Sequence, residues 1–469
     1  MRVLLIEAPY DYKISKIAVD QYFPLGLGYI AAVLKQAGEE VELLVSSPGC
    51  DFSQLLTSRL ERFVPELVGI SCMTPSFPTA IEIARAVKEQ TNAKVVLGGH
   101  HATALGEEIL QRYPEIDFVV YGEGESTMLD LCQKLGQGDY EDIPGLMWRE
   151  DALIHRNMPR PLIKDIDRLP FPARELVDMS AFGVHGHIKI GGRSATMITS
   201  RGCPYQCVFC SSRLTMGRSY RAHSPEYVVE EMELLAQKYQ VDYIVIEDDT
   251  FTVLPERTHE ICERLIERNL GIQWYCLSRV DKMDVSLAQK MKRAGCRMIA
   301  FGVESGDQEV LNRIGKRTSL EDAREAIKIC KEAGLRTQAT FVIGFPFDDL
   351  ETIGRTLDFA CELSPTVAII FPLTPYPGAE CFSYLSESQR PKALEDWKRF
   401  TMAIQEPPVS FIDGLSPRDL QRLANREHLR FYLRPKQLYE MLRTVRSAGE
   451  LVGYLNSALA FAMRYFDSR

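Results

Sequence analysis

The chain has 469 residues, of which 45% are hydrophobic and 25% are charged, a composition that excludes a disordered or fibrous chain. This length allows about three folded units at roughly 150 residues per domain. The formal net charge is −9 and no long basic block occurs, so nucleic acid is not expected to be the main partner.

No segment of the sequence predicts a transmembrane helix. The best apolar run, residues 451–466, is interrupted by Asn456 and Ser457 and is shorter than the roughly 20 residues that span a bilayer, so we expect a packed terminal helix there. The N-terminus reaches Glu7 before the apolar core of a signal peptide has formed. We therefore expect a cytoplasmic protein whose 12 cysteines are core residues or ligands rather than disulfide partners.

Residues 1–142 alternate short β-rich runs with amphipathic helical patterns. Strands are predicted at 3–7, 41–44, 67–71, 94–98 and 118–121, and helices at 26–37, 54–63, 76–91, 105–113 and 126–135. Five consecutive βα units of this kind predict a Rossmann-like open parallel sheet in an α/β fold. Ligands of such sheets bind beyond the carboxyl ends of the strands.

Residues 143–190 interrupt this alternation and are predicted to be a linker, with a small hairpin at 143–147 and 152–155. The βα pattern returns in residues 191–400. Strands are predicted at 195–199, 243–247, 273–277, 298–303, 337–343 and 367–371, and helices at 225–239, 255–268, 285–294, 320–333 and 350–363. Six βα units predict a partial (β/α)6 TIM barrel. Residues 401–469 predict a C-terminal helical region.

Three cysteines follow the first predicted barrel strand at C-x3-C-x2-C spacing, namely Cys203, Cys207 and Cys210. A short loop can bring three thiolates to one cluster, and thiolates are the usual ligands of iron–sulfur centres. Zinc is the alternative, but tetrahedral zinc needs a fourth ligand, and the nearest later donor is His223. The other cysteines lack ligand spacing and are predicted to pack in the core; they are Cys50, Cys72, Cys132, Cys262, Cys276, Cys296, Cys330, Cys361 and Cys381.

The cysteine motif, with the aromatic Phe209 before its last cysteine, resembles that of the radical S-adenosylmethionine (SAM) family. The resemblance implies that Cys203, Cys207 and Cys210 bind a [4Fe–4S] cluster and so serve catalysis. In that family the remaining iron chelates SAM, and an electron from the cluster cleaves SAM to a 5′-deoxyadenosyl radical.

Further positions that resemble SAM contacts follow the later barrel strands. Glu247 and Asp248 lie in an acidic motif expected near the SAM amino group, and Arg279 is expected to meet the SAM carboxylate. The remaining SAM contacts that the resemblance implies are Phe209, Glu304, Ser305, Ile343 and Tyr376. Taken singly, Arg279 could be a surface ion pair and Asp248 a helix cap.

An open parallel sheet before such a barrel resembles the cobalamin-binding (class B) radical SAM enzymes. The likeness includes the stretch from Tyr22 to Gly28, the strand-end loops and the proline-containing linker near Pro170. It implies cobalamin contacts from Pro24, Leu25, Gly26, Ser71, Thr74, Gly98, Gly99, His100, His101, Gly122, Glu123 and Gly124. The chain has no D-x-H-x-x-G string, so no histidine is assigned as the lower cobalt ligand; a domain that binds no cobalamin is the alternative.

The expected function is therefore that of a radical SAM enzyme with three cofactors: a [4Fe–4S] cluster, SAM and cobalamin. The resemblance implies methylation of an unactivated carbon by way of methylcobalamin. The alternative is a cyclase or rearrangement enzyme, similar to the anaerobic magnesium-protoporphyrin ester cyclase, and a non-catalytic sensor or electron carrier is a third hypothesis. The expected partners are a small-molecule or peptide substrate and a low-potential electron donor such as flavodoxin or ferredoxin.

Overall fold

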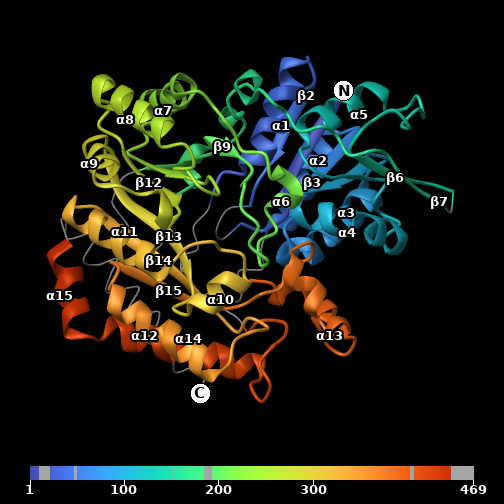
Figure 1. Ribbon diagram of the computed structural model, residues 1–469. Coiled ribbons are helices and arrows are strands. Elements are labelled where there is room, and N and C mark those ends of the chain that lie inside the picture. The colour runs from blue at the N-terminus through green and yellow to red at the C-terminus, as the bar shows by residue number, and fades with distance from the viewer. Residues whose placement is uncertain (10–21, 47–49, 152, 184–192, 402–405, 445–469) are drawn as a thin grey trace.

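The computed structural model describes residues 1–9, 22–46, 50–151, 153–183, 193–401 and 406–444 (Figure 1). The apolar run at 451–466 lies outside these residues. Within the described part of the chain, no helix has the length and apolar character needed to cross a bilayer.

The N-terminal unit is a seven-stranded sheet in the order β2-β1-β3-β4-β5-β6-β7, with the first five strands parallel. These strands are β1 (Arg2–Glu7), β2 (Glu40–Leu44), β3 (Leu67–Ser71), β4 (Lys94–Gly98) and β5 (Phe118–Val120). The helices are α1 (Leu25–Gln36), α2 (Phe52–Phe63), α3 (Phe77–Gln90), α4 (His100–Arg112) and α5 (Glu125–Lys134). The open parallel sheet predicted from the sequence is confirmed.

Helices cover both faces of this sheet, which is why its strands are apolar on both sides. On one face α1 and α5 pack on the side chains of Leu5, Val96 and Val120. On the other face α2, α3 and α4 pack on Leu4 and its neighbours in β3 and β4. The helices leave the carboxyl-terminal ends of the parallel strands uncovered.

The predicted hairpin is present as β6 (Leu146–Glu150) and β7 (Leu153–Arg156). Its strands do not stand apart in a linker, because β6 pairs with β5 in antiparallel fashion and extends the first sheet. The chain then runs through three single turns, η3 (Ile166–Arg168), η4 (Arg174–Leu176) and η5 (Met179–Ala181), toward the second unit.

The second unit is a curved sheet of six parallel strands in the order β8-β11-β12-β13-β14-β15 (Figure 1). The strands are β8 (Ser194–Met197), β11 (Tyr243–Ile246), β12 (Gln273–Ser278), β13 (Cys296–Glu304), β14 (Arg336–Ile343) and β15 (Val367–Pro372). The helices outside it are α7 (Pro225–Tyr239), α8 (Pro255–Arg268), α9 (Val285–Arg293), α11 (Leu320–Glu332) and α12 (Leu350–Leu363). This is the predicted partial (β/α)6 barrel.

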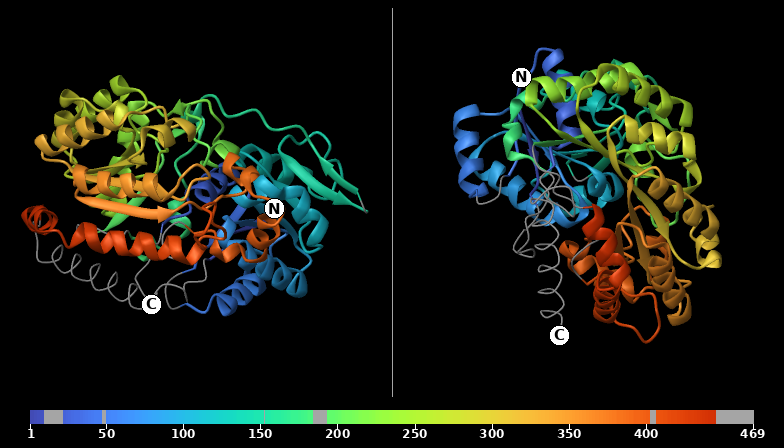
Figure 2. Two further views of the ribbon diagram at one scale, coloured as in Figure 1. Left: turned by 60° about the horizontal axis from the view of Figure 1, so that its bottom comes forward. Right: turned by 90° about the vertical axis from the view of Figure 1, so that its left-hand side faces the viewer.

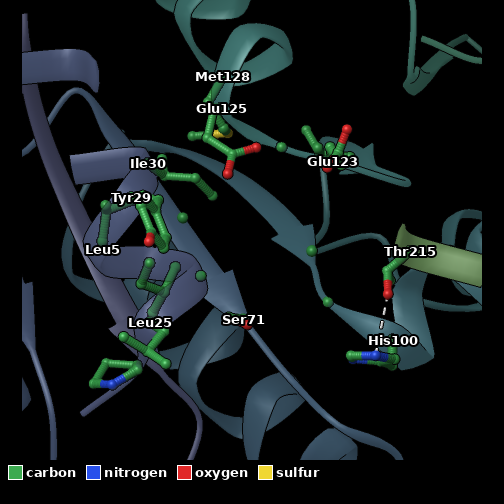
Figure 3. Close-up of a pocket in the computed structure, with 18 of the residues that line it drawn as sticks. Leu5, Leu25, Tyr29, Ile30, Ser71, His100, Glu123, Glu125, Met128 and Thr215 are labelled. Atoms are coloured by element: carbon green, nitrogen blue, oxygen red, sulfur yellow. Dashed lines mark hydrogen bonds between the residues drawn. The ribbon is translucent and has the colours of Figure 1, made fainter. Parts of the chain in front are cut away.

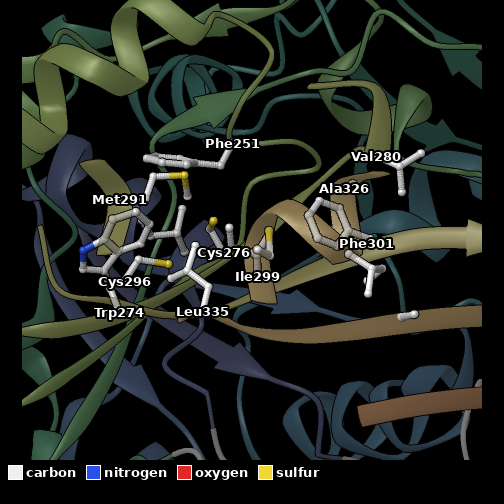
Figure 4. Close-up of a cluster of buried hydrophobic side chains, with 14 of the residues drawn as sticks. Phe251, Trp274, Cys276, Val280, Met291, Cys296, Ile299, Phe301, Ala326 and Leu335 are labelled. Carbon is white, nitrogen blue, oxygen red and sulfur yellow. The ribbon is translucent and has the colours of Figure 1, made fainter. Parts of the chain in front are cut away.

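The barrel core lies between the strands and the outer helices. Trp274 is buried there, and Cys276 and Cys296 lie among apolar side chains of the same cluster (Figure 4). Seven of the nine cysteines predicted to pack in the core are buried, whereas Cys50 and Cys361 are half-buried.

Shorter elements complete the barrel. Next to the cysteine motif lie β9 (Ser200–Arg201), β10 (Arg221–Ala222) and α6 (Arg213–Met216), and α10 (Gln308–Arg313) follows β13. The last strand is followed by three short helical segments that the sequence analysis did not predict, η7 (Glu380–Tyr384), α13 (Gln389–Glu395) and η8 (Trp397–Arg399). Beyond residue 400 the described residues contain the helices α14 (Pro417–Tyr432) and α15 (Pro435–Thr444), in the region predicted to be helical.

Helix α14 lies along the outer side of β15 (Figure 2). His428 Nε2 of this helix accepts a hydrogen bond of 2.8 Å from the Ile370 amide of the strand. The indole of Trp397 packs on the imidazole of His101 with ring centroids 4.7 Å apart, so the segment before α14 also reaches the N-terminal unit.

Candidate active site between the two sheets

The three cysteines of the motif lie on one loop between β9 and α6. The Val208 amide donates to the Ile314 carbonyl at 3.0 Å, and the Val208 carbonyl accepts from the Cys381 amide at 2.8 Å. Gly202, just before the motif, has φ of +81°, and a Cβ there would lie 2.4 Å from the Ser219 carbonyl oxygen. The loop is therefore held by backbone contacts that leave its thiols available to a ligand.

The thiols are close enough to influence one another. Burial raises the pKa of Cys203 and Cys207, and that of Cys210 to about 12, and neighbouring thiols of the motif add to the rise at Cys207 and Cys210. In the described residues no three His, Cys, Asp or Glu side chains converge as ligands of a single metal ion would. A four-iron cluster differs in this respect, because each cysteine binds a separate iron at its own corner.

The acidic motif after β11 divides into groups with different surroundings. Asp248 is buried and accepts hydrogen bonds of 2.6–3.1 Å from the amides and hydroxyls of Thr199 and Ser200. Asp249 instead accepts from the Ser212 hydroxyl at 2.5 Å, and its charge acts on Cys203 and Cys210. Asp248 thus braces the strand end before the cysteine loop, while Asp249 is the carboxylate beside the thiols; Glu247 is exposed at the strand end.

A buried ion pair lies beside the cysteine loop. Lys316 Nζ donates to Glu304 Oε1 at 2.7 Å, and both side chains are buried. Glu304 follows a register shift in β13 and has φ of +70°, an uncommon value for a residue with a side chain. Burial lowers the pKa of Lys316, but Glu304 and Cys207 outweigh this effect and leave that pKa above its ordinary value.

Arg279 lies in the same group but most of its donors are already engaged. Its guanidinium lies 3.6 Å from the ring centroid of Tyr205, inside the cysteine loop. Nε donates to Asp281 at 2.9 Å and Nη2 to the Lys316 carbonyl at 2.8 Å. Arg279 therefore joins the cysteine loop to the segment that carries Lys316, and its positive charge lies near Cys203 and Cys207.

The other residues predicted to contact SAM have mixed surroundings. Ser305 is buried and its hydroxyl lies 3.0 Å from that of Thr356. The side chain of Ile343 belongs to the outer barrel core, and its carbonyl accepts from the Leu373 amide at 2.8 Å. Tyr376 donates its hydroxyl to the Phe400 carbonyl at 3.0 Å, and the Phe209 ring lies 5.8 Å from that of Phe345.

A cavity of about 300 Å³ opens at the carboxyl-terminal ends of the strands of the first sheet (Figure 3). Ten of the twelve residues predicted to contact cobalamin line it, and these are Pro24, Leu25, Gly26, Ser71, Gly98, Gly99, His100, Gly122, Glu123 and Gly124. Thr74 and His101 do not line this cavity. The two side chains contact each other instead, with His101 Nδ1 3.3 Å from Thr74 Oγ1.

The shape of the cavity follows from strand alternation. The register of the parallel strands places Leu5, Gly69 and Val96 in one layer of inward-facing positions, and Glu7, Ser71, Gly98 and Val120 in the layer above it at the strand ends. Gly98 in the upper layer and Gly122 just beyond β5 leave the backbone uncovered, which is the condition for close approach of a bulky ligand.

The barrel supplies the other side of the cavity. Ile198, Arg201, Thr215 and Met216 line it, and all four flank the cysteine loop in the sequence. The hydroxyl of Thr215 lies 3.1 Å from His100 Nε2, which joins α6 to the first residue of α4 (Figure 3).

A buried network of charges joins the two sheets at the same place. Arg201 donates to Glu123 at 3.0 Å and to Glu125 at 2.6 Å, and Arg221 donates to Glu123 at 2.8 Å. The side chains of all four residues are buried. Arg201 precedes the cysteine loop and both glutamates follow β5. This network therefore fixes the cysteine loop of the second unit against the end of β5 in the first sheet.

Several site residues were missed by the sequence analysis. Glu7, Glu125, Arg201 and Thr215 line the cavity, and Lys316 pairs with Glu304. Glu125 adjoins the stretch 122–124 that was already singled out, and Glu7 ends the first predicted strand, so their position was a usable signal. Lys316 offered none, because it lies in a loop 12 residues beyond its partner.

Comparison with known proteins agrees with this geometry. A model of the radical SAM superfamily matches residues 197–360, and a model of the B12 binding domain matches residues 17–131. An uncharacterized methyltransferase of Pyrococcus horikoshii is 33% identical over 440 residues, which cover 93% of this chain and 94% of that one. The anaerobic magnesium-protoporphyrin IX monomethyl ester cyclase of Rubrivivax gelatinosus is 28% identical over 100% of this chain and 84% of its own length.

Solved structures share the fold. The radical SAM methyltransferase TsrM from Kitasatospora setae, with cobalamin and a [4Fe–4S] cluster bound, has a TM-score of 0.69 at 20% identity, covering 82% of this chain and 75% of that one. The cobalamin-dependent radical enzyme OxsB has a TM-score of 0.67 at 21% identity, covering 95% and 62%.

The fold and the site together define a radical SAM enzyme with a B12-binding domain. The chain belongs to the family of cobalamin-dependent radical SAM enzymes. The cofactors of this family are a [4Fe–4S] cluster, SAM and cobalamin.

Proposed function

We propose that this enzyme transfers a methyl group from SAM, by way of cobalamin, to an unactivated carbon of its substrate. The observation that carries the proposal is the cavity with two walls, one from the B12-binding sheet and the other from residues that flank the cysteine loop. Methylation of an unactivated carbon needs the radical formed from SAM and the methyl group carried by cobalamin to reach the same substrate. The name of the Pyrococcus relative, a methyltransferase, supports the same reading.

The cysteine loop suits a [4Fe–4S] cluster. Three thiols on one braced loop match a cluster that keeps one iron for SAM, and Arg279 and Lys316 supply positive charge that favours the thiolate form of Cys207. When bound, the cluster and SAM supply a carbon-centred radical, and cobalamin supplies a transferable methyl group.

The residues around the thiols suit the amino acid end of SAM. Asp249 beside the thiols is an acidic group for its ammonium, as is Glu247 at the exposed end of β11. Lys316 is the buried cation for its carboxylate, with Glu304 holding it in place. We assign Arg279 to bracing the loop and to its charge, because Asp281 and two backbone carbonyls occupy the donors of its Nε and Nη2. Phe209, Ser305, Ile343 and Tyr376 stay proposed contacts for the rest of SAM.

The cavity suits cobalamin. Gly26 and Gly122 have no other atom within 4 Å of where a Cβ would stand, so ligand atoms can reach their backbone. A volume of about 300 Å³ would hold part of this cofactor, and Ser71, His100 and Thr215 are among the residues that would hold it at the carboxyl-terminal ends of the strands.

We propose that the enzyme works in the cytoplasm, and its cysteines support this location. All twelve are free thiols in the structure, which suits a reducing cytoplasm. The cluster then needs a low-potential electron donor such as flavodoxin or ferredoxin. The substrate is a small molecule or peptide that enters between the two sheets.

The experiment is anaerobic reconstitution with iron, sulfide, cobalamin, SAM and a low-potential reductant, followed by quantification of 5′-deoxyadenosine and S-adenosylhomocysteine. Both nucleosides are expected when a substrate is supplied. Formation of 5′-deoxyadenosine alone would instead support a cyclase or rearrangement. A fully loaded protein that forms neither would refute the enzymatic assignment.

The cysteine variants give the matched test. Cys203→Ala, Cys207→Ala and Cys210→Ala are each expected to lose most of the bound iron and to reduce 5′-deoxyadenosine at least about 100-fold, because a cluster with one ligand missing is not held in place. Cys361→Ala, on the half-buried face of α12, is the control and keeps its iron. Iron retained in all three motif variants would contradict the assignment.

A further inference from the structure

The cysteine loop reaches the surface of the protein between its first two cysteines. Pro204 and Gln206 are exposed, and Cys207 follows Gln206 directly. The cavity is lined by residues that flank the loop, such as Arg201 and Thr215, rather than by these two. The loop therefore has an exposed stretch that is separate from the cavity and one residue away from a proposed cluster ligand.

Two exposed arginines lie beside this stretch. Gly315, in the connection between α10 and α11, packs on the cysteine loop. A Cβ on Gly315 would lie 2.8 Å from the Gln206 carbonyl oxygen and 4.0 Å from the Cys207 Cα. Arg313 and Arg317, two residues before and two residues after Gly315, are both exposed. The contact at Gly315 thus brings two guanidinium groups to the exposed part of the cysteine loop.

Further contacts hold the two segments together. The Arg279 guanidinium lies 3.6 Å from the ring centroid of Tyr205 in the cysteine loop and donates to the Arg317 carbonyl at 3.3 Å. The Arg313 guanidinium lies 4.2 Å from the ring centroid of Phe347, which supports it from below. The name loop patch is used for the exposed residues of both segments, Pro204, Gln206, Arg313 and Arg317.

The loop patch itself carries positive charge. Three acids lie around it, and these are Glu309, one helical turn before Arg313, Asp281, which accepts from Arg279 at 2.9 Å, and Glu380, which accepts from the Tyr384 hydroxyl at 2.8 Å. The open side of the same site instead carries the exposed acids Glu247 and Asp249. Because the whole chain has a net charge of −9, an acidic protein approaches the cysteine loop more favourably at the loop patch than at the open side.

The position of the loop patch suits the delivery of electrons. Electron transfer between proteins slows steeply with distance, so a carrier has to dock where the cluster ligands lie close to the surface. On the open side, SAM and the substrate would stand between a docked protein and the cysteines. At the loop patch, Gln206 is exposed next to Cys207, and the open side stays free for the substrate.

We propose that the loop patch is the docking surface for the electron donor, and that this donor is a small acidic carrier protein of the flavodoxin type. The proposal rests on the proposed function, which requires that the cluster be reduced. One electron passes from the reduced carrier to the cluster, so the carrier is oxidised by one electron, the cluster is reduced by one, and no atom is transferred. Arg313 and Arg317 attract and orient the carrier.

The test compares Arg313→Glu/Arg317→Glu with the native protein at equal iron content. Reduction of the cluster by reduced flavodoxin, followed by stopped-flow absorbance at low ionic strength, is expected to be at least about tenfold slower in the variant, because charge reversal at a docking surface slows association. Added salt is expected to slow the native reaction and to narrow this difference. Reduced methyl viologen, a small cation that needs no docking surface, is expected to reduce the variant no more slowly than the native protein.

The matched control is Arg112→Glu/Arg293→Glu, which has the same net charge and changes exposed residues in the last turns of α4 and α9. It is expected to keep the native rate with flavodoxin. Binding of oxidised flavodoxin to the apoprotein, measured by flavin fluorescence, is expected to weaken in Arg313→Glu/Arg317→Glu and decides the question if that variant takes up no iron. Equal rates or equal affinities in this variant and the native protein would overturn the inference and leave the proposed function standing. A native protein that takes up no cluster would contradict the proposed function itself.

Discussion

At the scale of single residues, Lys316 is the group that we propose to hold the carboxylate of SAM. It is a buried cation beside Cys207, and its partner Glu304 adopts a left-handed backbone conformation. Such conformations gather where the surrounding structure holds a functional group in place. The pair therefore holds the Lys316 ammonium in one position, and we propose that this ammonium binds the carboxylate of SAM.

We predict that Lys316→Met weakens SAM binding at least tenfold and lowers the free energy of unfolding by about 3–5 kcal/mol, because Glu304 is left charged and buried without a partner. Equilibrium dialysis with SAM and chemical denaturation measure the two effects. The double variant Lys316→Met/Glu304→Leu is expected to recover stability but not SAM affinity. A double variant that recovers both would reduce Lys316 to a structural role.

Glu7 provides a prediction of pH dependence. Burial raises the pKa of its carboxyl from 4.5 to about 7. The folded protein therefore binds more protons than the unfolded chain between about pH 4.5 and pH 7, and this residue makes the free energy of unfolding fall as pH rises through that range. The other charged or titratable groups lining the cavity are the same in native protein and variant; they are Tyr29, His100, Glu123, Glu125 and Arg201.

Glu7→Gln is expected to remove this contribution. Relative to the native apoprotein, the variant gains about 1–3 kcal/mol above pH 7 and nothing below pH 4.5. Urea denaturation from pH 4 to pH 8 measures the difference. A difference that does not change with pH would show that Glu7 has an ordinary pKa in the folded protein.

At the scale of elements, the strands and helices of both sheets were predictable because their periodicity is strong and repeated. Helices α7, α8 and α12 have the predicted limits, each with proline or a capping residue at its start. The elements that were missed are short. The strands β9 and β10 have two residues each, and α10 has six residues. These elements are too short for a repeating pattern of hydrophobic residues to be recognised in the sequence.

The same limit applies to the site. The cysteine motif and the strand-end loops could be found because each occupies a short continuous stretch. Lys316 could not, because only the packing of its loop on the cysteine motif brings it to Glu304, as seen at Gly315, where a Cβ would lie 2.8 Å from the Gln206 carbonyl. Nor could the sequence show that Asp249, rather than Asp248, turns toward the thiols.

Helix α11 offers a prediction at this scale. Ser319 caps its first turn by accepting from the Asp322 amide at 3.0 Å, while Asp322 accepts from the Ser319 amide at 2.7 Å. Ser319→Ala is expected to lower the free energy of unfolding by about 1 kcal/mol without changing the affinity for SAM. Thermal denaturation and SAM titration measure the two quantities. Loss of SAM affinity in this variant would mean that the start of α11 contributes to the site.

At the scale of the whole molecule, the segment between the two sheets is tied to both. Arg174 is buried, donates to Glu231 of α7 at 2.6 Å and to the Thr196 carbonyl at 2.9 Å, and lies 5.0 Å from the ring centroid of Phe23. A ligand cavity with walls from two units needs such a fixed connection, since its width depends on how they sit against each other.

Arg174→Leu is expected to lower the free energy of unfolding by about 3–5 kcal/mol, because Glu231 is left charged in the core. Arg174→Leu/Glu231→Leu is expected to regain most of that loss. The two variants are compared by denaturation of the apoprotein. A double variant no more stable than the single one would show that the contacts with Thr196 and Phe23, rather than the ion pair, hold the units together.

We propose that methyl transfer passes through the cavity at the carboxyl-terminal ends of the strands of the first sheet. Gly98→Val tests it most directly. Position 98 has extended backbone suited to valine, its Cβ would meet only the Val120 carbonyl at 3.8 Å, and the added side chain would project into the cavity. The measurement is S-adenosylhomocysteine formed by native and variant proteins with equal iron content, beside the cobalamin each retains. We expect the variant to lose both bound cobalamin and S-adenosylhomocysteine formation. Undiminished S-adenosylhomocysteine from a variant that retains no cobalamin would show that methyl transfer does not pass through this cavity.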